Sequence, residues 1–290
     1  MSITLDTRCL MCHFQRNLST AQSLGSEAQA MEFARGLMEI YLNSPPDVGA
    51  TYYGPDVEKL FRKIYGLEGD RFKAEKDASN AFVLARMDRI QEKVRAASDP
   101  VLAGLQMAIL GNYIDFSALY GEVSFEKLDK MLDEALKIEL DKNSYTSLCW
   151  ELESGKKLLY LTDNAGEIGF DRIFAEEISC RWPHLQITFC VRGGPTLNDA
   201  TREDACAVGI PFPVIDNGNT VAGTQLELLG AEAKQAMETA DVIIAKGQAN
   251  AETLLGSGYN IYYAFLVKCV RFIERYQKPK LTPMLVREKS

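Results

Sequence analysis

The chain has 290 residues, a composition ordinary for a soluble globular protein, and a formal net charge of −8 with a pI near 5.0. This acidic balance argues against a nucleic-acid partner and against binding to an anionic membrane. No run is apolar over enough residues to span a bilayer, and Asp6 and Arg8 interrupt the stretch that a signal peptide would need. We therefore expect a cytoplasmic protein with neither a nucleic-acid nor a membrane partner, and we make no prediction of its oligomeric state.

Residues 1–153 carry apolar side chains at helical spacing, and we predict that they form a helical domain. The clearest helix is GPDVEKLFRKIYG (54–66), where Pro55 suits the first position and Asp56 suits the positive end of the helix dipole. Further helices are expected near residues 70–96, 99–113 and 128–136.

The pattern changes near Lys156 to alternating strands and helices. Strands are expected near residues 157–162, 186–191, 212–215, 241–245 and 260–267. Helices are expected near residues 167–181, 199–208, 223–239, 249–256 and 268–276. This alternation predicts an α/β domain over residues 154–290, a three-layer α/β/α sandwich around a mostly parallel, Rossmann-like sheet.

Three loops that follow predicted strands carry polar residues. The first provides Asp163 and Asn164, the second Asn198 and Asp199, and the third Lys246 and Asn250. Loops of this kind meet at the carboxyl edge of an open α/β sheet, where ligands bind. Hard oxygen ligands beside a lysine suggest a divalent cation and a phosphate. Taken singly, these residues could also be helix caps and a solvated lysine.

Glycines and one glutamate in the same loops have two interpretations each. Gly193, Gly194 and Gly247 can point backbone N–H groups at phosphate oxygens, or they can simply form turns. Glu167 lies in the first turn of a predicted helix, where it can act as a base for a water molecule or only stabilise the helix dipole.

Several common catalytic motifs are absent. The sequence has no GxxxxGK[ST] P-loop, no GxGxxG dinucleotide fingerprint and no GxSxG nucleophile elbow. Haloacid-dehalogenase-type phosphatases carry a second Asp two residues after the first, and Ala165 occupies that position here. We therefore favour a mechanism in which a metal-bound water attacks directly over one that forms a covalent phosphate on Asp163.

Cys9 and Cys12 form a single CxxC next to His13. One CxxC is half of a metal or redox site, and Cys269 is a conceivable third ligand. We favour the alternative that these are reduced cysteines on a helix that packs inward. The seven cysteines do not form a disulfide framework.

The sequence contains the motifs DNAGEIGFD (163–171), RGGPTLNDAT (192–201) and AKGQANAETL (245–254). Through these motifs it resembles the metal-dependent damage-control phosphatases, formerly a domain-of-unknown-function family. CLMC (9–12), GNYIDF (111–116) and the pair Lys76 and Asn80 also match family positions, and the CxxC indicates the subgroup that has one. The resemblance covers nearly the whole chain. One departure is Ala249, where the family commonly has Gly.

The resemblance implies a helical domain on an α/β/α sandwich and a bound Mn, Co, Ni or Mg ion. The family's metal ligands would fall on Asp163, Asn164 and Asp199, and its phosphate-binding lysine on Lys246. Asn112 would lie near the site, and Asp115 is a second candidate from the same motif. The family's substrates are small phosphorylated metabolites, including sugar phosphates and phosphopantetheine-like compounds, which indicates a role in metabolite repair.

We therefore predict a metal-dependent phosphatase that hydrolyses a small phosphorylated metabolite by attack of a metal-bound water. Asn198 and the loop glycines would join Lys246 and Asn112 in binding the phosphate. One alternative is a protein carboxyl methyltransferase that uses S-adenosylmethionine, although no glycine-rich loop of that type follows the first strand. Another alternative is a non-catalytic module that binds a phosphorylated metabolite or a metal.

Overall fold

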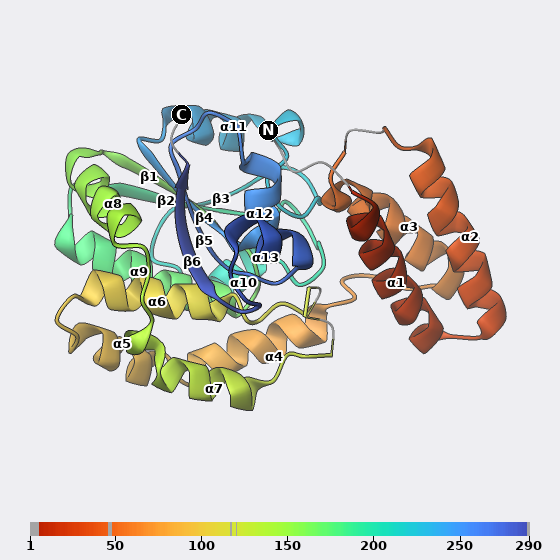
Figure 1. Ribbon diagram of the computed structural model, residues 1–290, viewed down its shortest axis with the longest axis horizontal. Helices are drawn as coiled ribbons and strands as arrows, with labels where there is room; N and C mark the ends of the chain where they lie inside the picture. The colour runs from red at the N-terminus through yellow and green to blue at the C-terminus, as the bar shows by residue number, and fades with distance from the viewer. Residues whose placement is uncertain (1–5, 46–47, 117, 120, 289–290) are drawn as a thin grey trace.

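The computed structural model describes residues 6–45, 48–116, 118–119 and 121–288. In the helical first half, the α-helices are α1 (Thr7–Leu24), α2 (Glu27–Asn43), α3 (Gly54–Tyr65), α4 (Lys73–Leu84), α5 (Met87–Arg95), α6 (Pro100–Gly111), α7 (Phe125–Asp133) and α8 (Lys142–Ser154). The second half contains α9 (Glu167–Arg181), α10 (Arg202–Ala207), α11 (Ala231–Thr239), α12 (Gly247–Leu254) and α13 (Val270–Tyr276) (Figure 1).

The sheet follows the order β3-β2-β1-β4-β5-β6. Its strands are β1 (Lys157–Leu161), β2 (Gln186–Val191), β3 (Val214–Asp216), β4 (Val242–Lys246), β5 (Ile261–Leu266) and β6 (Pro283–Glu288). The first five strands pair in parallel and β6 pairs antiparallel to β5. The predicted α/β class with a mostly parallel sheet is confirmed.

Helices cover both faces of this sheet, and the inner strands β1, β2, β4 and β5 are therefore almost entirely buried. One face packs against α6 and α9 in the largest hydrophobic cluster, and the other packs against α11, α12 and α13. The helices α4, α5 and α7 lie outside α6 and α9 (Figure 1). The cluster on the first face contains residues of both α6 and β1, so the hydrophobic core crosses the boundary predicted at residue 153. That boundary stays a prediction.

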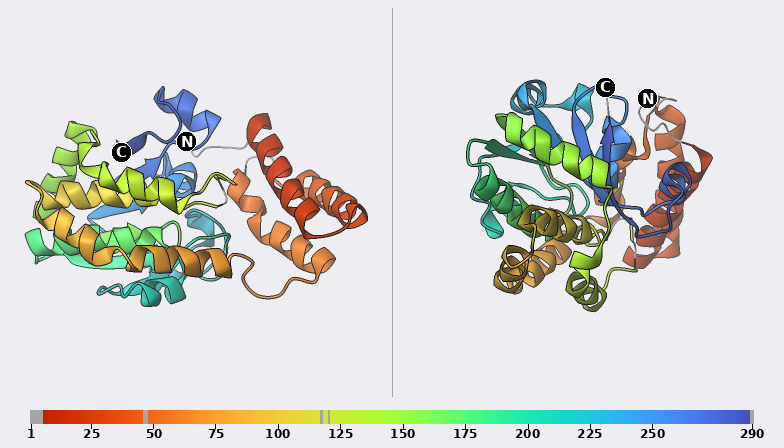
Figure 2. Two further views of the ribbon diagram at one scale, coloured as in Figure 1. Left: turned by 90° about the horizontal axis from the view of Figure 1, so that it is seen from below. Right: turned by 60° about the vertical axis from the view of Figure 1, so that its left-hand side comes forward.

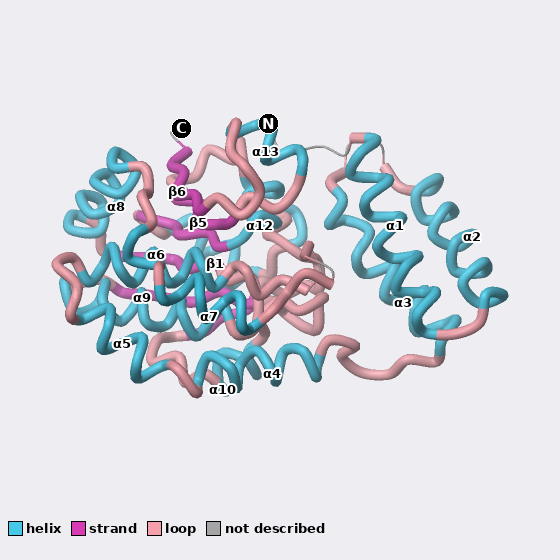
Figure 3. The backbone as a smooth tube through the Cα atoms, turned by 60° about the horizontal axis from the view of Figure 1, so that its bottom comes forward, coloured by secondary structure: helices cyan, strands magenta, loops and turns pink. Residues whose placement is uncertain are grey.

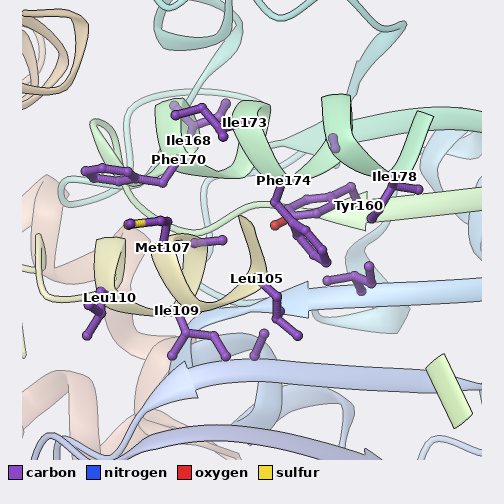
Figure 4. Close-up of a cluster of buried hydrophobic side chains, with 14 of the residues drawn as sticks. Leu105, Met107, Ile109, Leu110, Tyr160, Ile168, Phe170, Ile173, Phe174 and Ile178 are labelled. Atoms are coloured by element: carbon purple, nitrogen blue, oxygen red, sulfur yellow. The ribbon is translucent and has the colours of Figure 1, made fainter. Parts of the chain in front are cut away.

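The close packing of α6 against α9 positions one side of the polar cluster described below. Figure 4 shows Met107 of α6 and Phe170 and Phe174 of α9 between the two helices. A Cβ atom on Gly111, the last residue of α6, would lie 2.6 Å from Cδ2 of Phe170. Because glycine has no Cβ, the end of α6 can approach the start of α9 this closely.

The first three helices form a group at one end of the molecule, away from the sheet (Figure 2). They have a hydrophobic cluster of their own, with Phe33 and Phe61 at its centre. Arg8 of α1 reaches the body of the protein through an ion pair with Glu274 of α13 at 2.7 Å. Within the described ranges, no helix has both the length and the hydropathy needed to cross a membrane.

Three sequence predictions differ from the structure. The single helix expected over residues 70–96 is two helices, α4 and α5, because the backbone breaks at Ala85 and Arg86. The helix expected over residues 223–239 begins only at Ala231, after Gly230. Strand β6 was not predicted, because its alternation is weak and it begins with a proline, as edge strands can.

Candidate active site

The polar residues predicted from the loops lie at the carboxyl ends of β1, β2 and β4. Strand β1 has β2 on one side and β4 on the other, so the chain direction across the sheet reverses between β1 and β4. Crevices at such a reversal are the usual ligand sites of open α/β sheets. Figure 3 shows loops gathered at this end of the strands, toward the helices α1, α2 and α3.

The loops after β1 and β2 are joined by backbone hydrogen bonds. The N–H of Ala200 donates to the carbonyl of Asp163 at 2.7 Å, and the N–H of Ala165 donates to the carbonyl of Asn198 at 2.9 Å. An isolated antiparallel bridge pairs Asn164 with Asp199. The three residues predicted to hold a metal are therefore brought together by the backbone itself.

Asp163 is 4% exposed, and its side chain is enclosed by Asn112, by Asn164 and by the start of α12. Its Oδ2 accepts hydrogen bonds from the side-chain amides of Asn112 at 2.9 Å and Asn164 at 2.8 Å. Gly247, which follows β4, has a φ of +75°, and a Cβ atom there would lie 1.9 Å from the same Oδ2. Only glycine combines this conformation with this approach.

Glu167 is fully buried and links the three residues Asn112, Asn164 and Lys246. Its Oε1 accepts from Lys246 at 2.7 Å, and its Oε2 accepts from the amides of Asn164 at 2.6 Å and Asn112 at 2.9 Å. Both carboxylate oxygens are thus occupied, which gives Glu167 a positioning role that neither sequence interpretation foresaw.

Lys246 is also fully buried, and its ammonium group has three acceptors. It donates to Glu167 at 2.7 Å, to Asp171 at 2.6 Å and to the carbonyl of Ala108 at 2.9 Å. An ammonium group has three donors, so none remains for another ligand in this arrangement. Burial alone would lower the pKa of Lys246, but the charges of Asp171 and Glu167 outweigh it and raise that pKa.

Asp199 pairs with a buried arginine. Arg192 Nε lies 2.6 Å from Asp199 Oδ2, and both side chains are almost fully enclosed. Burial raises the pKa of Asp199, and the charge of Arg192 opposes this rise. Asn250 also reaches this region, because its amide donates to the carbonyl of Thr162 at 3.0 Å.

Asn198 has its amide nitrogen committed and its oxygen open. Nδ2 donates to Asn164 Oδ1 at 2.9 Å and to the carbonyl of Ile114 at 3.1 Å. The buried Oδ1 has no partner within the described part of the chain. An open acceptor suits a cation or a water molecule, whereas a phosphate oxygen would require a donor.

Open acceptors and unbalanced charge together fit a divalent cation here. Among the described residues, no hydrogen bond reaches Asp163 Oδ1 or Asp199 Oδ1, and no ion pair reaches Asp163. Burial, followed by repulsion from Glu167 and Asp199, raises the pKa of Asp163 well above its usual range. Open carboxylate and amide oxygens are the donor set that hard cations prefer. The described residues contain no cluster of three His, Cys, Asp or Glu side chains that could hold a metal ion, so a cation here would need an amide oxygen in addition to the two aspartates.

The predicted loop glycines differ in what their backbones offer. The N–H of Gly193 is taken by the carbonyl of Asn219 at 3.0 Å. Gly247 begins α12, and Glu167 begins α9 beside the same cluster. Neither helix receives a hydrogen bond from the side chain of its N-cap residue. At the start of α9, however, the N–H groups of Ile168 and Gly169 already donate to the carbonyls of Asn164 and Gly166, so the N-terminus of α12 is the one that suits an anion.

The sequence interpretation missed three charged residues of the cluster. Asp171 lies one helical turn after Glu167 and shares Lys246 with it. Arg192 directly follows β2, the position that identified the other candidates. Lys268, two residues after β5, pairs with Asp115 at 2.6 Å. The rule of polar residues after strands could have found Arg192 and Lys268, but their ion pairs depend on the fold.

The cysteines of the CxxC lie on α1, as expected for a helix. Cys12 is exposed, so the prediction that both cysteines pack inward is wrong for this residue. Cys9 Sγ accepts a hydrogen bond from Arg271, and Cys269 Sγ accepts one from Gln248. All three thiols are free and, in the described structure, they do not form a metal cluster.

Comparisons with known proteins agree with this fold. A family model described as the damage-control phosphatase ARMT1-like domain matches residues 5–281. A damage-control phosphatase of Pyrococcus horikoshii is 31% identical over 293 residues, covering 97% of each chain. One of Archaeoglobus fulgidus is 34% identical over 217 residues, covering 73% of this chain and 74% of that protein. The crystal structure of a DUF89 family protein from Pyrococcus horikoshii matches with a TM-score of 0.83 at 27% identity, covering 99% of both chains.

Proposed function

The chain belongs to the ARMT1-like damage-control phosphatase family, and we propose that it is a divalent-metal-dependent phosphatase acting on a small phosphorylated metabolite. Relatives named damage-control phosphatases support the phosphatase activity. The observation that carries the proposal is the meeting of Asp163, Asn164 and Asp199 at the reversal point of the sheet, with open oxygens on Asp163, Asp199 and the neighbouring Asn198. Membership of the CxxC subgroup and a cytoplasmic location stay predictions.

The metal would be held by Asp163, Asn164 and Asp199. These are hard oxygen donors, which suit Mg or Mn and also accept Co or Ni. When bound, the cation would offset the charge of the phosphoryl oxygens and lower the pKa of a coordinated water. Arg192 orients Asp199 by its 2.6 Å contact, and Asn112 orients Asp163.

The attacking water would be oriented by the carboxylate of Asp163 or Asp199, and its proton would finish on the oxygen of the leaving alcohol. Glu167 is less suited to this task because both of its oxygens already accept hydrogen bonds. Its role is to hold Asn164 beside Asp163, while Lys246 holds Glu167. A direct contact of Lys246 with phosphate would require the ammonium to leave one of its three acceptors.

The phosphate would be received by backbone N–H groups at the N-terminus of α12, whose N-cap residue provides no side-chain hydrogen bond. Gly247 allows the start of α12 to lie against Asp163, so phosphate and metal would share one small volume. Backbone N–H groups at helix N-termini stabilise the charge that develops on phosphoryl oxygens.

Entry of a substrate requires movement, because Asp163 and Asp199 are each 4% exposed. A cleft of about 330 Å³ lies on the outer side of the loop that carries Asp199. Pro195, Thr196 and Leu197 form one wall, and Arg62 of α3 contributes to the other. We assign the part of the substrate beyond the phosphate to this cleft.

The test is phosphate release from a panel of phosphorylated metabolites. The protein is stripped with chelator and reconstituted separately with Mn, Co, Ni and Mg. Asp163→Asn is the test variant, and Asp88→Asn, the same change at an exposed position on α5, is its matched control. The proposal predicts release that requires a metal, persists in Asp88→Asn and disappears in Asp163→Asn.

Two other results would contradict the proposal. Release that continues without metal, or in Asp163→Asn, would show that these ligands are not the catalytic ones. A protein that binds metal and phosphate but hydrolyses none of the panel would support the non-catalytic binding module instead.

A further inference from the structure

Two buried polar residues of α4 face the site loops from the helical half of the chain. Lys76 and Asn80 are four residues apart, so they lie on the same side of the helix. They are 2% and 5% exposed. Buried polar side chains on a helix that packs between other elements require partners, and both residues find theirs near the two loops that carry the proposed metal ligands.

Asn80 contacts the first loop through its oxygen. Oδ1 accepts a hydrogen bond from the backbone N–H of Gly166 at 2.7 Å. Gly166 lies between Asn164 and Glu167 and has a φ of +76°. A Cβ atom on Gly166 would be 2.7 Å from Cβ of Ser79, so α4 packs directly on this loop. The turn that places Asn164 and Glu167 is therefore held from α4.

Asn80 contacts the segment after the second loop through its nitrogen. Nδ2 donates to Asp204 Oδ1 at 2.9 Å. Asp204 Oδ2 accepts from the N–H and the hydroxyl of Thr201, both at 2.8 Å, which fixes Thr201, the N-cap residue of α10, two residues after Asp199. The helices α4 and α10 lie side by side (Figure 3).

Lys76 balances the charge of this arrangement. Its ammonium lies 2.9 Å from Asp204 Oδ2 and 3.2 Å from Asp70 Oδ2. Asp70 belongs to the segment that joins α3 to α4. A buried carboxylate without a cation would be costly, so Lys76 supplies the positive charge beside Asp204, which accepts hydrogen bonds from both Asn80 and Thr201.

We infer that Asn80 is a positioning residue that sets the two metal-ligand loops relative to each other, with Lys76 and Asp204 completing the contact. Asparagine suits the position because one side chain must accept from Gly166 and donate to Asp204 at once. The role in catalysis rests on the proposed function, whereas the coupling of the two loops does not.

The coupling is tested by hydrogen–deuterium exchange on the metal-free protein. Asn80→Ala removes both contacts. The matched control is Gln91→Ala, which removes an amide–carboxylate bond of 2.8 Å between α5 and α9, away from the loops. We expect peptides covering residues 162–168 and 199–206 to exchange about tenfold faster in Asn80→Ala, and at the wild-type rate in Gln91→Ala. Faster exchange confined to α4 would overturn the inference.

The second experiment exchanges the amide of Asn80 and the carboxylate of Asp204. Asn80→Asp places two carboxylates face to face, and we expect Mn²⁺ affinity to fall about tenfold or more. Asn80→Asp combined with Asp204→Asn restores one amide opposite one carboxylate, so loop exchange and Mn²⁺ affinity should recover. A double variant no better than Asn80→Asp would overturn the inference. If the wild type binds no Mn²⁺ and releases no phosphate, the proposed function fails, and the exchange data alone decide the coupling.

Discussion

Replacing Gly247 by alanine tests how closely the start of α12 must approach Asp163. The φ of +75° is a left-handed conformation that costs alanine about 1–2 kcal/mol. The added Cβ would lie 1.9 Å from Asp163 Oδ2, whereas real Cβ contacts are almost never below 3.0 Å. Asp163 or the loop must therefore move by roughly 1 Å, a displacement that can lower turnover about a hundredfold.

Gly258→Ala is the control for this variant. Gly258 has a φ of +81°, and its added Cβ would meet no atom within 4 Å, so it shares the backbone cost without the overlap. Thermal unfolding, Mn²⁺ titration and phosphate release are measured on both variants. We expect both variants to lose about 1–2 kcal/mol of stability from the backbone conformation, and Gly247→Ala to lose more because of the overlap. The loss of Mn²⁺ affinity and of turnover should be confined to Gly247→Ala. Equal Mn²⁺ affinity and equal turnover in the two variants would refute the reasoning.

Three further changes have defined outcomes. Lys246→Met leaves the buried carboxylates of Glu167 and Asp171 without their cation, so it should lower the free energy of unfolding by about 3–5 kcal/mol in urea denaturation. The exposed Lys59→Met is the control, and a loss in Lys246→Met no larger than in Lys59→Met would contradict this prediction. Asp163→Asn removes a buried charge that has no ion pair among the described residues, so the metal-free variant should melt no lower than the wild type at pH 8, and a lower melting temperature would count against this account. Burial lowers the pKa of His13 to about 3, so the folded state keeps it neutral while the unfolded chain takes up a proton near its ordinary value. Stability should therefore fall with pH below about 6.5, by at most about 1.4 kcal/mol per pH unit; His13→Gln should flatten this dependence and the exposed His184→Gln should not, as urea denaturation at pH 7.5 and pH 5 would show.

Local patterns were enough to predict most of the sheet. The strands β1, β2, β4 and β5 are short apolar runs, and each is followed by a loop of Gly, Asn, Asp or Lys. Such runs are typical of parallel strands buried on both faces. Strand β6 has no such pattern, because it is an antiparallel edge strand whose partner β5 determines its conformation. Edge pairing is a property of the fold and leaves little trace in a local window.

The candidate site was predictable to the extent that its residues follow strands. Asp163, Asp199 and Lys246 share this position, and the parallel order of the sheet brings them to one edge. The partners that fix them come from elsewhere in the chain. Asn112 at the end of α6 and Asn80 on α4 reach the first loop across 51 and 86 residues of sequence. Their contacts depend on how the helices pack, and this packing cannot be derived from residue spacing alone.

The roles of Lys246 and Glu167 show the same limit. Lysine beside glycine after a strand suggests a group that faces a phosphate, and a glutamate in a first helical turn suggests a base. In the fold, the two side chains bind each other at 2.7 Å in a fully buried position. Burial and pairing decide what a charged residue can do, and neither can be read from its place in the sequence.

The measurement that tests the central claim most directly is anomalous diffraction from crystals of the protein grown with Mn²⁺. The account predicts one strong peak within coordination distance of Asp163, Asn164 and Asp199, at the carboxyl ends of β1 and β2, and no peak there in crystals of Asp163→Asn. A well-occupied Mn²⁺ site elsewhere in the protein, with Asp163 and Asp199 contacting only protein groups, would contradict it.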